Sequence, residues 1–134
     1  MSASKKSRQA PEHTHRSNMA QTFKYAFAGI GYTIRSQRNM KVHLAIAALA
    51  LFASAFLQLT VFEWAVIIIL IGLVFTGEML NTAIEAIVDL LSPEFHPLAK
   101  VAKDVGAGMV LILAIVSVIS GVLIYGSALL RLVG

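Results

Sequence analysis

The sequence predicts an all-α membrane protein in which one amphipathic surface helix precedes three membrane-spanning helices. Two observations support this prediction. Hydrophobic residues make up 57% of the 134 residues and charged residues only 13%, about half of what a soluble domain carries. The apolar residues are also concentrated in three long stretches, at 44–59, 62–91 and 105–132, which short polar segments separate. The length fits a single domain.

The N-terminal part of the chain divides into a polar tail and a helix. Residues 1–18 are polar and basic with no apolar period, so we expect a disordered cytoplasmic tail and a single domain over 19–134. Within 19–38, apolar side chains recur at spacings of three and four. They are Met19, Phe23, Phe27, Ile30 and Ile34. The pattern predicts an amphipathic helix in the membrane interface, with an ordinary packed helix as the alternative.

The first two apolar stretches have unequal lengths. The stretch at 44–59 is shorter than the roughly 20 residues that a span needs, so we expect its helix to continue back through Val42 and His43. The stretch at 62–91 would be about 45 Å long as a helix, which exceeds the hydrocarbon layer. Its polar C-terminal part should therefore reach the cytoplasmic interface.

Prolines and basic residues indicate the connections and the orientation. Pro93 and Pro97 are expected to end the second span and to stiffen the turn before the third. With a cytoplasmic N-terminus, all eleven Lys and Arg residues except Arg131 are cytoplasmic, which is the distribution that membrane proteins favour. This topology accounts for the net charge of +4, so no nucleic-acid partner is expected. The absence of cysteine excludes disulfides, thiol nucleophiles and cysteine metal sites.

Four polar side chains of the second span share one face of the predicted helix. At about 100° per residue they fall in a stripe about 80° wide. They are Glu78, Asn81, Glu85 and Asp89. A carboxylate costs several kcal/mol to place in hydrocarbon, so three on one spanning helix indicate a functional site. One helix cannot shield such a stripe from lipid, and we therefore expect an oligomer.

The segment after this stripe adds groups suited to phosphate. Glu94, His96 and Lys100 precede Lys103 and Asp104, which are expected at the N-terminus of the third span, where free N–H groups favour phosphate. Carboxylates for Mg²⁺, lysines for phosphate and one deeper carboxylate as base would together support phosphoryl transfer. The sequence contains no Walker A motif and no kinase Gly-rich loop.

Two other interpretations of the stripe remain. A small oligomeric proton-coupled transporter could use Glu78 as its proton relay. The charged segment at 94–104 argues against this, because transport needs no phosphate site. A purely structural role is the least favoured interpretation. His43 lies outside the stripe and is expected to reach the membrane interface.

Two motifs resemble those of a known family. EMLNTAIEAIVD at 78–89 is followed by EFHPLAK at 94–100 and by KD at 103–104, and RNMKVH occupies 38–43. With these residues the chain, over about 19–130, resembles the prokaryotic-type diacylglycerol kinases, which include undecaprenol kinases. The resemblance implies a homotrimer in the bacterial cytoplasmic membrane. It also implies transfer of the ATP γ-phosphate to the hydroxyl of a membrane lipid, with Mg²⁺ as cofactor.

The resemblance further implies individual roles. Glu78 would be the general base and Glu85 a metal ligand, supported by Asn81 and Asp89. Nucleotide contacts would come from Tyr25, Glu85, Glu94, Phe95, His96, Lys103 and Asp104.

One departure from the family pattern concerns the metal. Gln37 stands where the family usually has a glutamate expected to help bind it, and a neutral amide is a weaker Mg²⁺ ligand. A catalytically weak regulator is therefore a further possibility. The RNMKVH segment at 38–43 and the HPLAK segment at 96–100 look more like those of Gram-positive members, many of which phosphorylate undecaprenol. The choice between undecaprenol and diacylglycerol stays open.

Overall fold

The computed structural model describes residues 18–134, and in this range the chain forms four helices. They are α1 (Met19–Ser36), α2 (Arg38–Phe56), α3 (Val61–Leu91) and α4 (Pro97–Val133). The last three are long and apolar enough to cross a membrane, which confirms the predicted all-α fold with three spans. The predicted tail lies outside the described residues, apart from Asn18.

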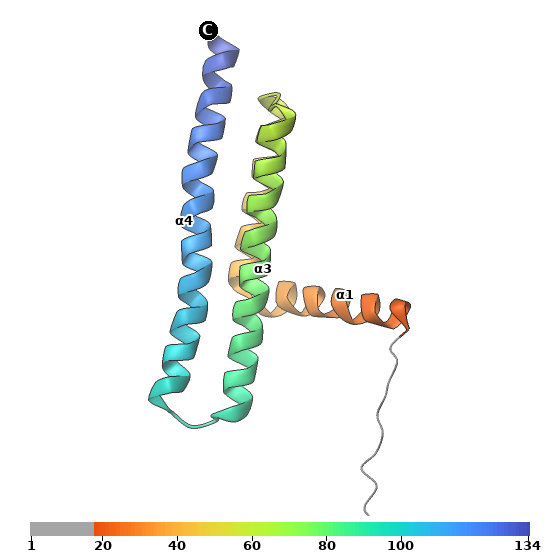
Figure 1. Ribbon diagram of the computed structural model, residues 1–134, viewed down its shortest axis with the longest axis vertical. Coiled ribbons are helices and arrows are strands. Elements are labelled where there is room, and N and C mark those ends of the chain that lie inside the picture. Colours follow the sequence, from red (N-terminus) through yellow and green to blue (C-terminus); the bar gives the residue numbers. More distant parts are fainter. Residues whose placement is uncertain (1–17) are drawn as a thin grey trace, which may run out of the picture.

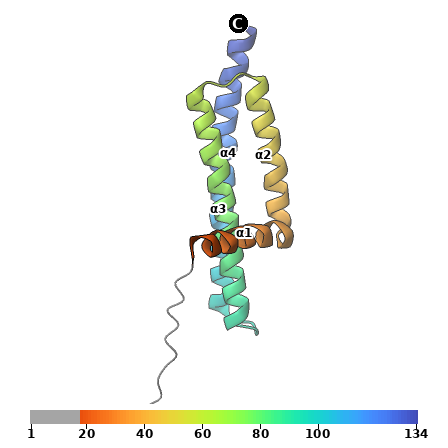
Figure 2. The ribbon, with the colours of Figure 1, turned by 90° about the vertical axis from the view of Figure 1, so that its right-hand side faces the viewer.

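Helix α1 projects sideways from the bundle of the other three helices (Figures 1 and 2). Figure 1 shows it level with the middle of α3, so the ends of α3 and α4 that the 92–96 segment joins extend beyond it. Its Phe23 and Phe27 are exposed, as expected for a helix that lies on a lipid surface. The helix ends where Gln37 takes an extended conformation, with φ −99° and ψ 121°. This one residue turns the chain into α2.

The first span begins earlier than its apolar stretch, as predicted. Helix α2 starts at Arg38, so the polar RNMKVH segment supplies the length that the apolar residues lack. The turn after α2 contains Gln58 at φ 50°, and α3 then begins with a capping box. In it the Thr60 side chain accepts the Glu63 N–H while Glu63 Oε2 accepts the Thr60 N–H.

The third span starts much earlier than the predicted residue 105. Helix α4 begins at Pro97, so this proline starts a helix and does not stiffen a loop. Proline fits the first helical position because its fixed φ is helical and no partner is needed for its missing N–H. His96 caps the helix, with Nδ1 accepting the Leu98 N–H at 3.2 Å. The expectation that Lys103 and Asp104 lie among free N–H groups is therefore wrong, because both lie beyond the first turn of α4.

Close packing of α3 on α4 depends on two glycines. A Cβ at Gly77 would come within 2.6 Å of Leu113 Cδ1, and one at Gly106 within 2.6 Å of Asn81 Oδ1. Most other apolar side chains point outward, and only 6% of the most apolar part of α4 is buried. Such a surface needs lipid or other copies of the chain around it.

Candidate active site

The polar stripe of α3 runs from a buried interior to an exposed helix end. Glu78 and Asn81 are buried, Glu85 is half-buried, and Asp89 is exposed. Each of the three carboxylates contacts a side chain from a different part of the chain. The stripe therefore forms three successive contacts along the helix, which we describe from the inside outward.

The innermost contact joins Glu78 to His43 of α2. Glu78 is only 1% exposed, and His43 Nε2 lies 3.2 Å from its Oε1. Oε1 nevertheless accepts no hydrogen bond within the described residues, because the approach of the imidazole lacks hydrogen-bond geometry. A buried carboxylate oxygen without a donor is costly and rarely retained without a function. The His43 side chain is mostly buried against this carboxylate, and its expected reach to the membrane interface stays a prediction.

The middle contact brings two amides onto one carboxylate. Gln37 Nε2 donates to Glu85 Oε2 at 3.0 Å, and Asn81 Nδ2 donates to Glu85 Oε1 at 3.1 Å. Asn81 Oδ1 faces Gly106 and accepts no hydrogen bond in the described part of the chain. Sequence reasoning predicted that Gln37 and Glu85 belong to one site, and the structure places them in contact.

The donor set around Glu85 fits Mg²⁺ in a limited way. Within residues 18–134 no three His, Asp or Glu side chains are grouped so as to hold a metal. Glu85 is thus the one anionic oxygen group here, with the amides of Gln37 and Asn81 beside it. Mg²⁺ commonly binds one or two carboxylates together with nucleotide phosphates and water. Glu85 and the nucleotide phosphates would therefore hold such an ion, and the amides of Gln37 and Asn81 present their N–H groups to Glu85.

The outermost contacts involve the two lysines of α4. Lys103 Nζ lies 2.5 Å from Asp89 Oδ1, and Lys100 Nζ lies 2.5 Å from Asp104 Oδ2. The second pair is spaced i, i+4 on one helix. All four side chains keep substantial exposure, so these ion pairs are weak and open to exchange with a phosphate.

The remaining predicted nucleotide contacts are not joined to the stripe. Tyr25 lies on α1 with 66% exposure, and Phe95 is 82% exposed. Glu94 and His96 are exposed in the 92–96 segment, and within residues 18–134 neither side chain bonds to a residue of the stripe. Their predicted role in nucleotide binding is untested by this geometry.

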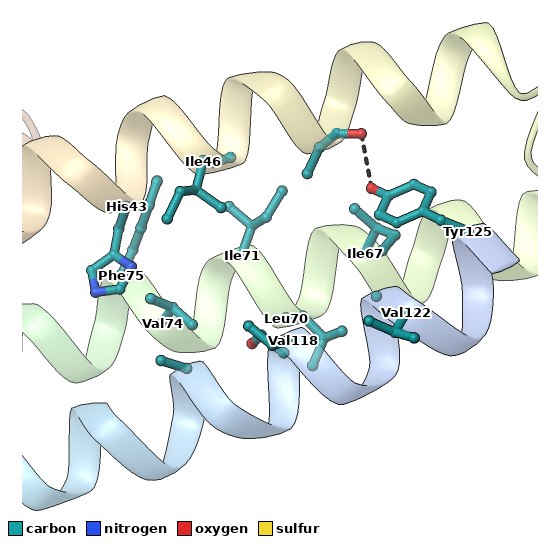
Figure 3. Close-up of a pocket in the computed structure, with 15 residues that line it drawn as sticks. His43, Ile46, Ile67, Leu70, Ile71, Val74, Phe75, Val118, Val122 and Tyr125 are labelled. Atoms are coloured by element: carbon teal, nitrogen blue, oxygen red, sulfur yellow. Dashed lines mark hydrogen bonds between the residues drawn. The ribbon is translucent and has the colours of Figure 1, made fainter.

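An apolar cavity opens beside the innermost contact. It has a volume of about 420 Å³ and lies between α2, α3 and α4 (Figure 3). His43 and Phe75 line one end, and Tyr125 lies at the other (Figure 3). The Tyr125 hydroxyl donates to the Ala50 carbonyl at 2.8 Å, and Ser117 in the wall donates to the carbonyl of Leu113. Of the polar side chains in the wall, His43 alone has no hydrogen bond to any other residue within 18–134.

His43 is the site residue that sequence reasoning missed. It lies on α2, far in sequence from the α3 stripe, and its partner depends on how the two helices are rotated against each other. The continuous helix through RNMKVH was the available signal, because it places His43 inside the first span. A histidine inside a span is a candidate functional group.

Comparison with known proteins shows which family this chain resembles. Residues 24–125 match the family described as prokaryotic diacylglycerol kinase. The chain is 44% identical over 114 residues to an undecaprenol kinase of Bacillus subtilis (strain 168), covering 83% of this chain and 93% of that protein. It is 41% identical over 105 residues to a diacylglycerol kinase of Synechocystis sp., covering 78% and 60%. It is 40% identical over 72 residues to the diacylglycerol kinase of Escherichia coli (strain K12), covering 54% and 59%.

Proposed function

This chain belongs to the prokaryotic diacylglycerol kinase family and is an ATP-dependent membrane lipid kinase, and on that premise we propose that its acceptor is a polyisoprenol such as undecaprenol. The membrane kinase activity replaces the alternative of a proton-coupled transporter. The observation that carries the finer proposal is the apolar cavity, in which the Tyr125 and Ser117 hydroxyls are already engaged and one end is lined by His43, the neighbour of Glu78 Oε1.

The cavity wall favours an acceptor with a single polar group. The hydroxyls of Tyr125 and Ser117 are already engaged by backbone carbonyls. Two ester groups of a diacylglycerol in this cavity would have only the His43 imidazole as an unengaged donor, and unpaired polar groups in a dry site are unfavourable. A polyisoprenol has one hydroxyl and an otherwise apolar chain. The undecaprenol kinase of Bacillus subtilis, which this chain matches over 93% of that protein, supports the same choice.

The proposed reaction assigns the proton to Glu78. The lipid hydroxyl approaches Oε1, and the Glu78 carboxylate takes its proton as the hydroxyl oxygen bonds to the γ-phosphorus of ATP. The bond between that phosphorus and the β–γ bridging oxygen breaks, which leaves ADP. Lys100 and Lys103 neutralise phosphate charge at the exposed end of the stripe. Mg²⁺, bound by Glu85 and the nucleotide phosphates, would offset the negative charge there.

Parallel assays with two lipids test the acceptor. Purified protein with Mg-ATP should phosphorylate undecaprenol with a kcat/KM at least roughly tenfold above that for diacylglycerol, about the discrimination that a poorly fitting polar group produces. A preference for diacylglycerol would overturn the polyisoprenol assignment and leave the lipid kinase activity intact.

The exposed apolar faces also support a homotrimer with a cytoplasmic N-terminus. Only 17%, 22% and 6% of the most apolar part of α2, α3 and α4, respectively, is buried within one chain. Cross-linking in the native membrane should give species up to a trimer, and a monomer or dimer as the largest species would contradict this.

The chain has no native cysteine, so Asn18→Cys and Gly134→Cys can each be labelled alone. They should react from opposite sides of the membrane, and reaction from one side would contradict the three-span topology.

A further inference from the structure

We propose that His43 is a positioning residue that donates from Nε2 to Glu78 and orients this carboxylate toward the lipid hydroxyl. The inference rests on the proposed role of Glu78 as base. Nothing in the sequence pattern or in the other two contacts along the stripe requires a histidine at this place on α2. Its distance of 3.2 Å from Oε1 is what sets it apart.

No other polar side chain of the described residues serves this carboxylate oxygen. Oε1 accepts no hydrogen bond, and the Thr82 hydroxyl on the same helix donates to the backbone carbonyl of Glu78. The buried residues of α4 are Gly106, Val110 and Ala128, and none of them has a side chain that can donate a hydrogen bond. Gln37 and Asn81 donate to Glu85, one contact further along the stripe. His43 is therefore the one group in reach that could fix the carboxylate.

The present geometry is close to a hydrogen bond without being one. Catalytic hydrogen bonds are often long or poorly aligned before substrate binds and tighten in the complex. His43 also lines the cavity in which the lipid chain is proposed to lie, so an incoming chain would press on the imidazole and on Glu78 together. Binding of the acceptor can thus complete the alignment that the free enzyme lacks.

A simpler explanation is that His43 only fills space in the cavity wall. Two substitutions separate the explanations because they rank in opposite orders. Glutamine keeps an N–H donor near the position of Nε2, whereas leucine keeps the bulk and suits the apolar wall. A filling role favours leucine, and a positioning role favours glutamine.

Steady-state kinetics of His43→Gln and His43→Leu provide the test, in the full chain with undecaprenol and Mg-ATP. We expect His43→Leu to lower kcat at least tenfold while KM for ATP stays within about threefold, since misplacement of a catalytic group acts on the reacting step. His43→Gln should retain kcat within about threefold of the unsubstituted chain. A leucine variant as active as the glutamine variant, or two variants equally inactive, would overturn the proposal.

A double substitution separates this inference from the proposed function. In the Glu78→Gln background, His43→Leu should change kcat by less than about twofold, because the group that it orients is already gone. A further large loss in that background would show that His43 acts elsewhere, which overturns the inference and leaves Glu78 as base. A Glu78→Gln variant with normal kcat would instead overturn the base assignment and the inference with it. Nucleotide binding by each variant checks that the protein is folded.

Discussion

Glu63 and Glu78 lie on the same helix, about 22 Å apart along its axis, and their surroundings are opposite. Glu63 accepts two hydrogen bonds at 2.8 Å from the guanidinium of Arg131 and also caps α3 through Thr60. Glu78 is more deeply buried, and within residues 18–134 its Oε1 accepts no hydrogen bond although His43 Nε2 lies 3.2 Å away. The first carboxylate is fully paired at one end of the bundle, and the second is left available beside the cavity.

The contrast separates a carboxylate that holds helices together from one that is kept for chemistry. The Glu63 pair ties the start of α3 to the end of α4, and the capping box ties it to the preceding turn. Every part of that arrangement stabilises the fold. A buried carboxylate oxygen that accepts no hydrogen bond destabilises the fold, because folding removes it from water without full compensation. Active sites keep such groups because their function needs an unoccupied acceptor.

The largest effect on activity is expected from neutralising Glu78, the buried carboxylate of this comparison. Glu78→Gln should lower kcat by at least roughly a hundredfold, the usual scale for loss of general-base help, with little change in ATP affinity. Its Tm should stay the same or rise, since a buried carboxyl group is replaced by a neutral amide. Phosphorylation kinetics, nucleotide binding and thermal unfolding measure the three effects. A variant that loses ATP binding and keeps kcat would place Glu78 in the nucleotide site.

The middle contact gives the next largest effect. Gln37→Glu should place a second carboxylate against Glu85, and their repulsion is relieved when Mg²⁺ binds. We expect the Mg²⁺ concentration for half-maximal activity to fall several-fold, with higher activity at limiting Mg²⁺. Gln37→Met, which keeps the length without an oxygen, is the matched control and should not lower this concentration. An unchanged or raised midpoint in the glutamate variant would remove Gln37 from the metal site.

Sequence reasoning reached the parts of the site that a single helix defines. Helical periodicity placed Glu78, Asn81, Glu85 and Asp89 on one face, and the structure confirms their common face. Helix α3 begins at Val61, one residue before the predicted start, and ends at Leu91 as predicted. These features depend on local geometry, which sequence spacing expresses directly.

The features that were missed depend on contacts between helices or on ambiguous residues. The contact of His43 with Glu78 requires a particular rotation of α2 against α3, and no local pattern specifies it. Pro97 was misread because proline follows one helix as readily as it begins the next. A proline therefore indicates a helix boundary, but its fixed φ does not determine whether the helix lies before or after it.

A smaller effect is expected from breaking the paired carboxylate. Glu63→Gln should lower Tm by a few degrees and leave kcat unchanged, because its contacts join α3, α4 and the turn. Arg131→Gln removes the same pair from the other side and should cause a similar fall. The double variant should unfold no earlier than the worse single one, as expected for partners in one interaction. A loss of kcat in Glu63→Gln would show that the two carboxylates are not separated in function.

The smallest effect concerns the hydrogen bond that closes the far end of the cavity. Tyr125 donates to the Ala50 carbonyl at 2.8 Å and lies 3.0 Å from the buried hydroxyl of Ser54. Tyr125→Phe removes only the hydroxyl, while Ser54 can still donate to the same carbonyl. Interhelical hydrogen bonds within membranes contribute about 0.6 kcal/mol on average, so we expect a slight fall in Tm with unchanged kcat. Ser117→Ala is the matched control in the same cavity, because its hydroxyl bonds within its own helix and should leave Tm unaltered. If Tyr125→Phe instead changes the preference between undecaprenol and diacylglycerol, the far end of the cavity takes part in acceptor selection. Tyr125 would then belong with Glu78 among the residues that serve the reaction, and not with Glu63 among those that only stabilise the fold.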